Sequence, residues 1–183
     1  MDHYLDIKVL PDLESTAQEL LNKLFSKLHR ALGQHTQGKV GVSFPQQGKL
    51  LGEILRLHGT KEDLSHLMDQ NWLQGLRDYT RCGALQPIPP QVKYRTVKRV
   101  QAKSAHNKRR RSILKGWLTE QQALEQIPDT QQKSLDMPFI QMGSLSNGNT
   151  MRIYIQHGDI LPQPQAGIFS AYGLSSTATI PWF

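Results

Sequence analysis

The chain has 183 residues, of which 38% are hydrophobic, enough for one large domain or two small ones with a packed core. No apolar run approaches the ~18 residues that a membrane span needs, and the start, MDHYLDIKVL, lacks the basic and apolar stretches of a secretory signal. The single cysteine, Cys82, can form neither an internal disulfide nor a thiolate metal site. These features predict a cytoplasmic protein with no membrane partner.

The net charge of +7 is concentrated in one segment. Residues 91–117 hold ten of the 22 Lys and Arg residues and no acid, which leaves 12 basic against 15 acidic residues elsewhere. Blocks of a single sign usually bind polyanions and less often form solvated arms. Because the segment also has few apolar residues, a membrane surface is disfavoured, and we expect a nucleic acid as the partner.

The first hundred residues alternate between strand and helix patterns. In chain order, these patterns predict a strand (3–10), a helix (13–32), two strands (39–44 and 50–58), a second helix (60–70) and a strand (94–101). The first helix carries an apolar stripe from Leu13 to Leu32, and the second opens on the capping residues Thr60 and Asp63. The order β-α-β-β-α-β is the split pattern of a ferredoxin-like fold.

The composition changes after residue 101. The patterns then predict a basic helix (104–117), a helix with a capping box (119–127), two strands (138–142 and 151–156) and one more strand within 165–176. The sequence therefore predicts an α+β chain. Its ferredoxin-like N-terminal domain spans residues 1–98, and a smaller domain with an arginine-rich helix and a few strands spans residues 99–183.

Several stretches together resemble one known family. MDHYLDI at the start, FSKLHRAL, GVSFP, RVQAKS, the arginine-rich helix, IPDT and the ending YGL…PWF resemble the CRISPR precursor-RNA endoribonuclease of the type I-F systems. The resemblance covers essentially the whole chain in register. It implies a ferredoxin-like domain followed by a domain with an arginine-rich helix, which agrees with the pattern of elements above.

The resemblance also implies an activity. Such an enzyme cleaves CRISPR repeat stem-loops in precursor crRNA without a metal, leaves a 2′,3′-cyclic phosphate and a 5′-hydroxyl, and stays bound to the 3′ hairpin of the mature crRNA. RNA supplies its own nucleophile, the 2′-hydroxyl, so such an enzyme needs a base and an in-line geometry. The sequence has no HExxH motif, no spaced carboxylate cluster and no Cys/His set, so we expect neither a metal nor another cofactor.

The catalytic candidates combine residue patterns with the resemblance. His29 lies at the edge of the apolar stripe, near the predicted helix C-terminus, which favours a protonated imidazole. The residues alone favour a half-exposed helix histidine, whereas the resemblance implies the catalytic base. It further implies a catalytic serine in the turn GSLSNGNT, at Ser144 with Ser146 as a second candidate, and an orienting or site-lining tyrosine at Tyr172. The residues by themselves also fit a plain hairpin turn and a packing tyrosine.

The arginine-rich helix is the main RNA-binding candidate. Lys108, Arg111 and Lys115 fall on one helical face, Arg109 and Arg110 add charge, and the apolar residues Ile113, Leu114 and Trp117 are expected to pack the helix down. A short hairpin with open ends admits such a helix into the groove that a long RNA helix closes. The family has arginines where this chain has Ser112, Lys115 and Gly116.

Further RNA-binding candidates flank this helix. Arg99 and Gln101 can pair with guanine and adenine edges, and the resemblance implies that they read base pairs at the bottom of the stem. Without the resemblance they would be an exposed strand end. Lys103 follows them, and Met151 stands where the family stacks an aromatic ring on a base.

The expected partners are the CRISPR repeat stem-loop RNA and other subunits of a type I-F surveillance complex. Three alternatives stay open at this point. The chain could be a non-catalytic hairpin-RNA-binding subunit of a ribonucleoprotein complex, a duplex-DNA-binding protein or a metal-dependent nuclease.

Overall fold

A computed structural model describes residues 1–101, 105–128, 135–143 and 150–183. The chain divides into two compact units, the first formed by residues 1–99 together with 137–183 and the second by residues 100–136. Helices and antiparallel sheets are both present, so the fold class is α+β, as expected. Among the described residues, none of the helices has the length and apolar content that crossing a membrane requires.

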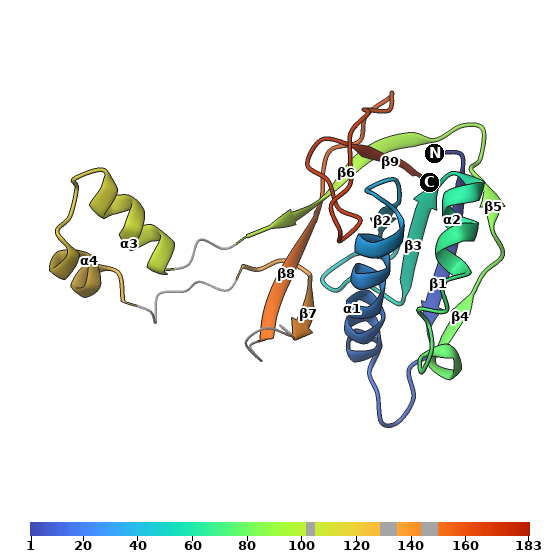
Figure 1. Ribbon diagram of the computed structural model, residues 1–183, viewed down its shortest axis with the longest axis horizontal. Coiled ribbons are helices and arrows are strands. Elements are labelled where there is room, and N and C mark those ends of the chain that lie inside the picture. Colours follow the sequence, from blue (N-terminus) through green and yellow to red (C-terminus); the bar gives the residue numbers. More distant parts are fainter. Residues whose placement is uncertain (102–104, 129–134, 144–149) are drawn as a thin grey trace. The chain divides into compact units, whose positions relative to one another are not determined.

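The first unit contains most of the regular structure (Figure 1). In chain order its elements are β1 (His3–Val9), α1 (Ala17–His35), β2 (Gly41–Ser43), β3 (Ile54–Gly59), α2 (Lys61–Met68), the 3₁₀ helix η1 (Arg77–Tyr79), β4 (Thr80–Cys82), β5 (Gln86–Pro87), β6 (Lys93–Val100), β7 (Phe139–Gly143), β8 (Thr150–His157) and β9 (Thr179–Trp182). The second unit contains α3 (Ala105–Leu114) and α4 (Glu120–Gln126).

The first sheet has the strand order β2-β3-β1-β4, and β5 also pairs with β1. All of these neighbours are antiparallel. Alternate residues of β1, Leu5, Ile7 and Val9, are buried, because successive side chains of a strand point to opposite faces. Both α1 and α2 contact this sheet, so its apolar face becomes part of the core.

Helix α1 begins later and ends later than the sequence pattern predicts. Thr16 caps it, since its side chain accepts a hydrogen bond from the Glu19 backbone while the Glu19 carboxylate accepts one from the Thr16 backbone. Leu13 therefore lies outside the helix and is fully exposed, so its expected place on the apolar stripe was wrong. The helix continues to His35, because its apolar stripe extends through the buried Ala31 and Leu32.

Strand β6 belongs to the second sheet, with the order β7-β8-β6-β9. The expectation that this segment completes the first sheet was wrong, since β4 and β5 pair with β1 instead. In β6, the Thr96 carbonyl accepts a hydrogen bond from Gly158, and Tyr94 exchanges backbone hydrogen bonds with Leu161. Antiparallel pairing with β9 satisfies its other edge.

The segment 165–176 is not a strand, contrary to expectation. Its backbone groups bond to several separate elements rather than in a ladder along one strand: Gln165 and Thr179 exchange hydrogen bonds, Phe169 N–H donates to the Gly38 carbonyl, and the Gly173 carbonyl accepts from Val42 N–H of β2. The last strand is β9, at residues Thr179–Trp182. This route carries residues 170–174 past α1 and β2.

A buried polar pair lies on the first sheet. His58 and Ser43 are both fully buried, and His58 Nε2 lies 2.8 Å from Ser43 Oγ. The other ring nitrogen, Nδ1, is buried with no hydrogen-bond partner among the described residues. Burial, aided by the positive charge of Arg56, lowers the pKa of His58 from 6.5 to about 3. A protonated His58 would therefore be strongly unfavourable in the folded protein.

We expect acid to destabilise the folded chain through His58. Below pH 6.5 His58 is protonated in the unfolded state but stays neutral in the folded state. The contribution of neutral His58 to the free energy of unfolding is therefore fully present above pH 6.5 and is lost as the pH falls toward 3. Between pH 7 and pH 5 the loss is about 2 kcal/mol from this residue. Urea unfolding at the two pH values should show a smaller pH dependence for His58→Gln than for wild type.

The half-buried His157 acts in the same direction, because burial and Arg95 lower its pKa to about 4. For this reason the comparison needs two further variants. His157→Gln should remove a second part of the pH dependence, and the double variant His58→Gln with His157→Gln should remove both parts. An unchanged pH dependence in His58→Gln would contradict the assignment.

Candidate active site

His29 lies on α1, half-buried at the edge of the apolar face that contains Phe25, Leu28 and Leu32. Its Nδ1 lies 2.9 Å from the carbonyl oxygen of Ala171. Since a carbonyl can only accept, Nδ1 must carry the hydrogen, and Nε2 of the neutral ring is left with a free lone pair. The hydrogen bond therefore fixes both the tautomer and the orientation of the imidazole.

The ring of Tyr172 stacks on His29. The two ring centroids are 4.1 Å apart with an interplanar angle of 8°, and on α1 Phe25 also lies parallel to Tyr172 at 6.3 Å. The guanidinium of Arg99, from β6, lies 5.4 Å from the centre of the Tyr172 ring. The structure thus brings three predicted site residues together from α1, β6 and the segment before β9.

A tight turn holds Ala171 and Tyr172 in place. Ser170 accepts a backbone hydrogen bond from Gly173 and donates its hydroxyl to the Leu174 carbonyl. Gly173 has a φ of +69°, and a Cβ there would lie 2.3 Å from a methyl carbon of Val42. Only glycine combines that backbone conformation with such close packing. The turn is therefore tied to β2, and with it the carbonyl that orients His29.

Arg99 has unused hydrogen-bonding capacity in this cluster. Its Nε is buried and has no hydrogen-bond partner among the described residues. A buried donor without a partner is costly unless a ligand or water satisfies it.

One reason for favouring His29 from the sequence does not hold. We expected the helix C-terminus to favour its protonated form, but α1 ends only at His35. His29 is therefore more than one turn from the end, and the helix dipole acts mainly within the last turn. The assignment of His29 as a site residue therefore rests on its contacts with Ala171 and Tyr172.

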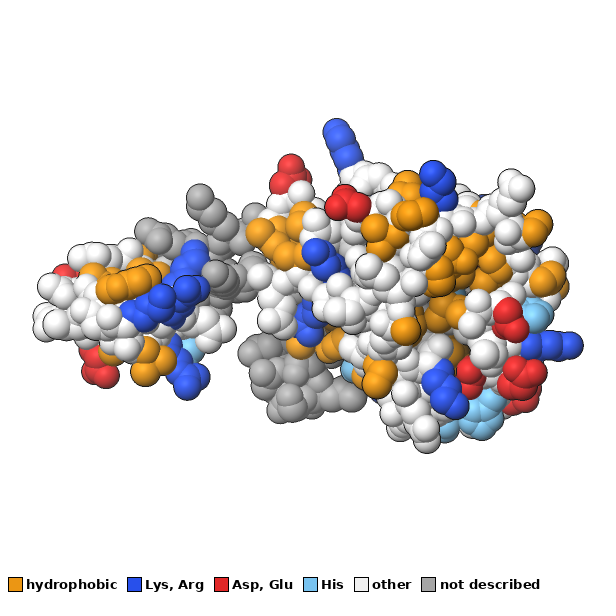
Figure 2. Space-filling view, turned by 90° about the horizontal axis from the view of Figure 1, so that it is seen from above, with side chains coloured by type: hydrophobic (Ala, Val, Ile, Leu, Met, Phe, Trp, Pro, Cys, Tyr) orange, Lys and Arg blue, Asp and Glu red, His pale blue; other side chains and the backbone are white. Residues whose placement is uncertain are grey.

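Basic side chains gather on the unit formed by α3 and α4 (Figure 2). Arg110, Arg111 and Lys115 are exposed, whereas Lys108 and Arg109 are half-buried. Arg109 Nη1 donates a 2.7 Å hydrogen bond to the Ile127 carbonyl just after α4. Part of the donor capacity of Arg109 therefore holds the two helices together.

The apolar residues near the end of α3 do not all pack. Ile113 is half-buried, but Leu114 is 75% exposed and Trp117 is 64% exposed, so the expectation that they hold the helix down was wrong for these two. The reason is the small size of the interface, in which only Ala105 on α3 and Ala123 on α4 are buried.

The remaining candidates lie in several places. Gln101 is exposed after β6, and Met151 is 37% exposed near the start of β8. Three predicted site residues, Lys103, Ser144 and Ser146, lie outside the described residues. The described part of the chain contains no group of three or more His, Cys, Asp or Glu side chains placed to hold a metal ion.

Two residues of α1 that sequence reasoning missed tie β7 to the helix. Gln18 donates a 2.9 Å hydrogen bond to the Phe139 carbonyl, and the Asn22 side chain accepts one from the Gln141 backbone. They also bond to each other at 3.0 Å. Their i, i+4 spacing is a helix signal, but nothing in it indicates a strand more than a hundred residues away. These bonds align the β7–β8 hairpin with α1.

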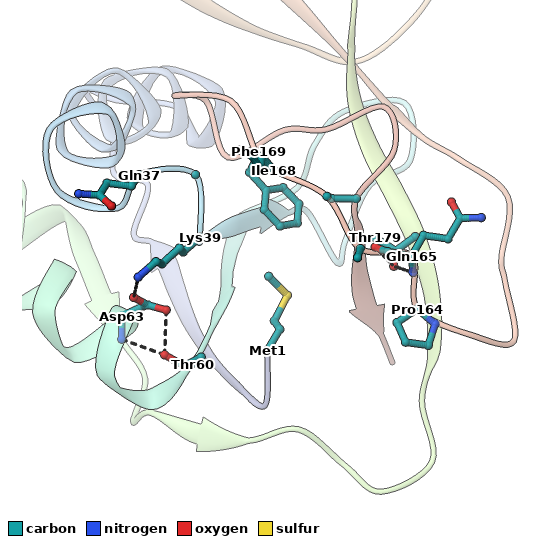
Figure 3. A pocket seen from close by; sticks show the side chains of 14 residues that line it. Met1, Gln37, Lys39, Thr60, Asp63, Pro164, Gln165, Ile168, Phe169 and Thr179 are labelled. Carbon is teal, nitrogen blue, oxygen red and sulfur yellow. Dashed lines mark hydrogen bonds and ion pairs between the residues drawn. The ribbon is translucent and has the colours of Figure 1, made fainter.

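A separate pocket of about 630 Å³ lies where Gln37–Lys39, the start of α2 and the segment 164–169 meet (Figure 3). Lys39 and Asp63 form an ion pair of 3.8 Å at its edge, and Asp63 also accepts from Thr60. Phe169 and the exposed Ile168 supply apolar surface. None of the predicted site residues lines this pocket.

The chain is similar to known proteins along its length. Residues 4–183 match a protein-family model described as "CRISPR-associated protein (Cas_Csy4)". Two relatives, each named "CRISPR-associated endonuclease Cas6/Csy4", are similar over the full length of both chains: one from Escherichia coli (strain UTI89 / UPEC) is 48% identical, and one from Pseudomonas aeruginosa (strain UCBPP-PA14) is 42% identical.

The chain therefore belongs to the Cas_Csy4 family of CRISPR-associated proteins, and its class is that of the CRISPR-associated endonucleases. This membership confirms the resemblance to the type I-F endoribonuclease that the sequence motifs indicated.

Proposed function

We propose that this protein is a metal-independent endoribonuclease that binds and cleaves CRISPR repeat stem-loops in precursor crRNA. Family membership supports the processing role, and the names of the relatives support nuclease activity. The observation that carries the chemistry is the hydrogen bond from His29 Nδ1–H to the Ala171 carbonyl, because it leaves Nε2 available as a base.

In the proposed reaction, Nε2 of His29 takes the proton of the 2′-hydroxyl beside the scissile phosphate. The 2′-oxygen then bonds to phosphorus, the bond from phosphorus to the 5′-oxygen breaks, and the leaving 5′-oxygen takes up a proton. The products are a 2′,3′-cyclic phosphate and a 5′-hydroxyl. The imidazolium that forms in the first step is a source for the second proton.

The other site residues have supporting roles in the proposal. Tyr172 holds the imidazole through the stacking contact, and the turn that contains Ser144 and Ser146 positions the 2′-hydroxyl. Arg99 and Gln101 read bases at the bottom of the stem, while Met151 covers a base beside the cleavage site. The cations Lys103, Lys108, Arg109, Arg110, Arg111 and Lys115 contact RNA phosphates.

The proposal extends to the fold and the assembly. We propose a ferredoxin-like domain at residues 1–98, which is supported by the strand order β2-β3-β1-β4 with antiparallel neighbours. Residues 99–183 then form the RNA-binding domain. In this proposal the enzyme works in the cytoplasm, stays on the 3′ hairpin of the crRNA and joins the other subunits of a type I-F surveillance complex.

The proposal is tested by incubating wild-type protein with a labelled repeat hairpin in excess EDTA. We expect one cut per hairpin, with a 2′,3′-cyclic phosphate on one product and a 5′-hydroxyl on the other. Cleavage that stops in EDTA would instead indicate a metal-dependent nuclease. Tight binding without cleavage would indicate a non-catalytic hairpin-binding subunit.

A further inference from the structure

Helix α3 ends in a Schellman motif. Gly116 has a φ of +67°, its N–H donates to the Ile113 carbonyl, and the Trp117 N–H donates to the Ser112 carbonyl. The backbone of Trp117 thus contributes to the end of the helix, whereas its side chain is not needed for that purpose.

The side chain at this position usually packs on an apolar residue of the last helical turn. Here the corresponding residues are Ser112 and Arg111, and neither offers an apolar surface. Trp117 is 64% exposed as a result, and the Lys115 ammonium lies 4.6 Å from the centre of its ring. The largest aromatic side chain of this unit is therefore presented to the outside, with a cation over its ring.

The surroundings of the ring select an anionic partner. From Ala105 to Trp117 the chain carries five Lys and Arg residues and no acid. An exposed aromatic ring beside a cation matches the chemistry of a nucleotide, whose base can stack on the ring while its phosphate pairs with the cation. A base inside a duplex has both of its faces covered, whereas an unpaired base leaves a face open for the ring.

We propose that Trp117 is a stacking platform for an unpaired nucleobase of the hairpin RNA, with Lys115 contacting the adjacent phosphate. The inference rests on the proposed function, because it adds a contact to a hairpin that the enzyme already binds. The end of α3 would then recognise a single-stranded nucleotide, and the cations along the helix would contact phosphates of the stem.

The test compares full-length wild type with Trp117→Phe, which keeps an aromatic ring, and Trp117→Leu, which does not. Leu114→Ala is the matched control, since it removes exposed apolar surface from the same end of α3. Each protein is titrated with the intact repeat hairpin and with hairpins in which single unpaired nucleotides are abasic. Because the ring is exposed and its backbone alone forms the helix end, these substitutions should leave the fold intact.

Trp117→Leu should raise the Kd for the intact hairpin about tenfold, and Trp117→Phe and Leu114→Ala should leave it within about threefold. One abasic hairpin should bind wild type and Trp117→Leu equally, because the stacking partner is gone from both. Hairpin binding should also quench the emission of wild type more than that of Trp117→Phe.

The inference would be overturned if Trp117→Leu weakened binding to the intact hairpin and to every abasic hairpin equally, or if it did not weaken binding at all. In either case, binding and cleavage of the hairpin by the wild type would still support the proposed function. A variant that binds hairpin normally but loses binding to a protein subunit of the complex would also overturn the inference. Failure of wild type to bind the hairpin would overturn both.

Discussion

Replacing His29 with alanine is expected to lower the single-turnover rate constant of hairpin cleavage by about 10²–10⁴-fold. The variant removes the only group in the proposed reaction that takes the 2′-proton. The Kd for the hairpin should change by less than about threefold, since the ring is half-buried against Ala171 and Tyr172 and its loss removes no cation of α3. Cleavage and filter-binding assays on the same preparation measure both quantities.

Two controls sharpen this prediction. His35→Ala changes another half-buried histidine of the same helix and should keep the wild-type rate. Free imidazole should partly restore cleavage in His29→Ala, because it can occupy the vacated space and take the proton. An equal loss of binding and cleavage, or no loss at all, would contradict the assignment of His29 as the base.

Removing Arg111 and Lys115 together is expected to weaken hairpin binding about 10- to 100-fold at low salt. Both side chains are exposed on the α3 unit, and residues 91–117 contain no acidic residue. Each phosphate contact releases counterions, so the slope of log Kd against log salt should fall by about one for each cation removed. Titrations at several salt concentrations measure the affinity and the slope together.

The matched control is the double variant Lys49→Gln with Lys61→Gln. It makes the same change in net charge at two exposed positions outside α3. If the loss reflected net charge alone, this control would weaken binding as much as the α3 variant does. We expect a change of less than about threefold and an almost unchanged salt slope, because these cations are not part of the proposed contact.

Much of the local structure could be predicted from the sequence. The apolar stripe predicts α1, and hydroxyl residues followed three positions later by Glu, Asp or Gln mark the starts of α1, α2 and α4. These signals are short in range, since the residues that form them lie within a few turns of each other. The apolar stripe alone places Leu13 in the helix, whereas the equally local capping box of Thr16 and Glu19 excludes it.

The partners of the strands could not be predicted in the same way. The pattern of β6 indicates a strand but not its neighbours, and the structure pairs it with β9 and places it beside β8. Similarly, the alternation within 165–176 suggests a strand, whereas hydrogen bonds to Gly38 and Thr179 hold this segment in another conformation. Pairing depends on which distant backbone groups remain unsatisfied, and no local pattern records that.

The sequence by itself determined the fold class, the family and the one-signed charge of the α3 segment, because these follow from composition, local periodicity and shared motifs. Only the tertiary structure decided which nitrogen of His29 is available, since that depends on a carbonyl 142 residues away. It also decided that Trp117 is exposed and that Arg109 partly serves the fold. The bonds of His29 and Arg109 are contacts between separate segments, and such contacts exist only once the chain has folded.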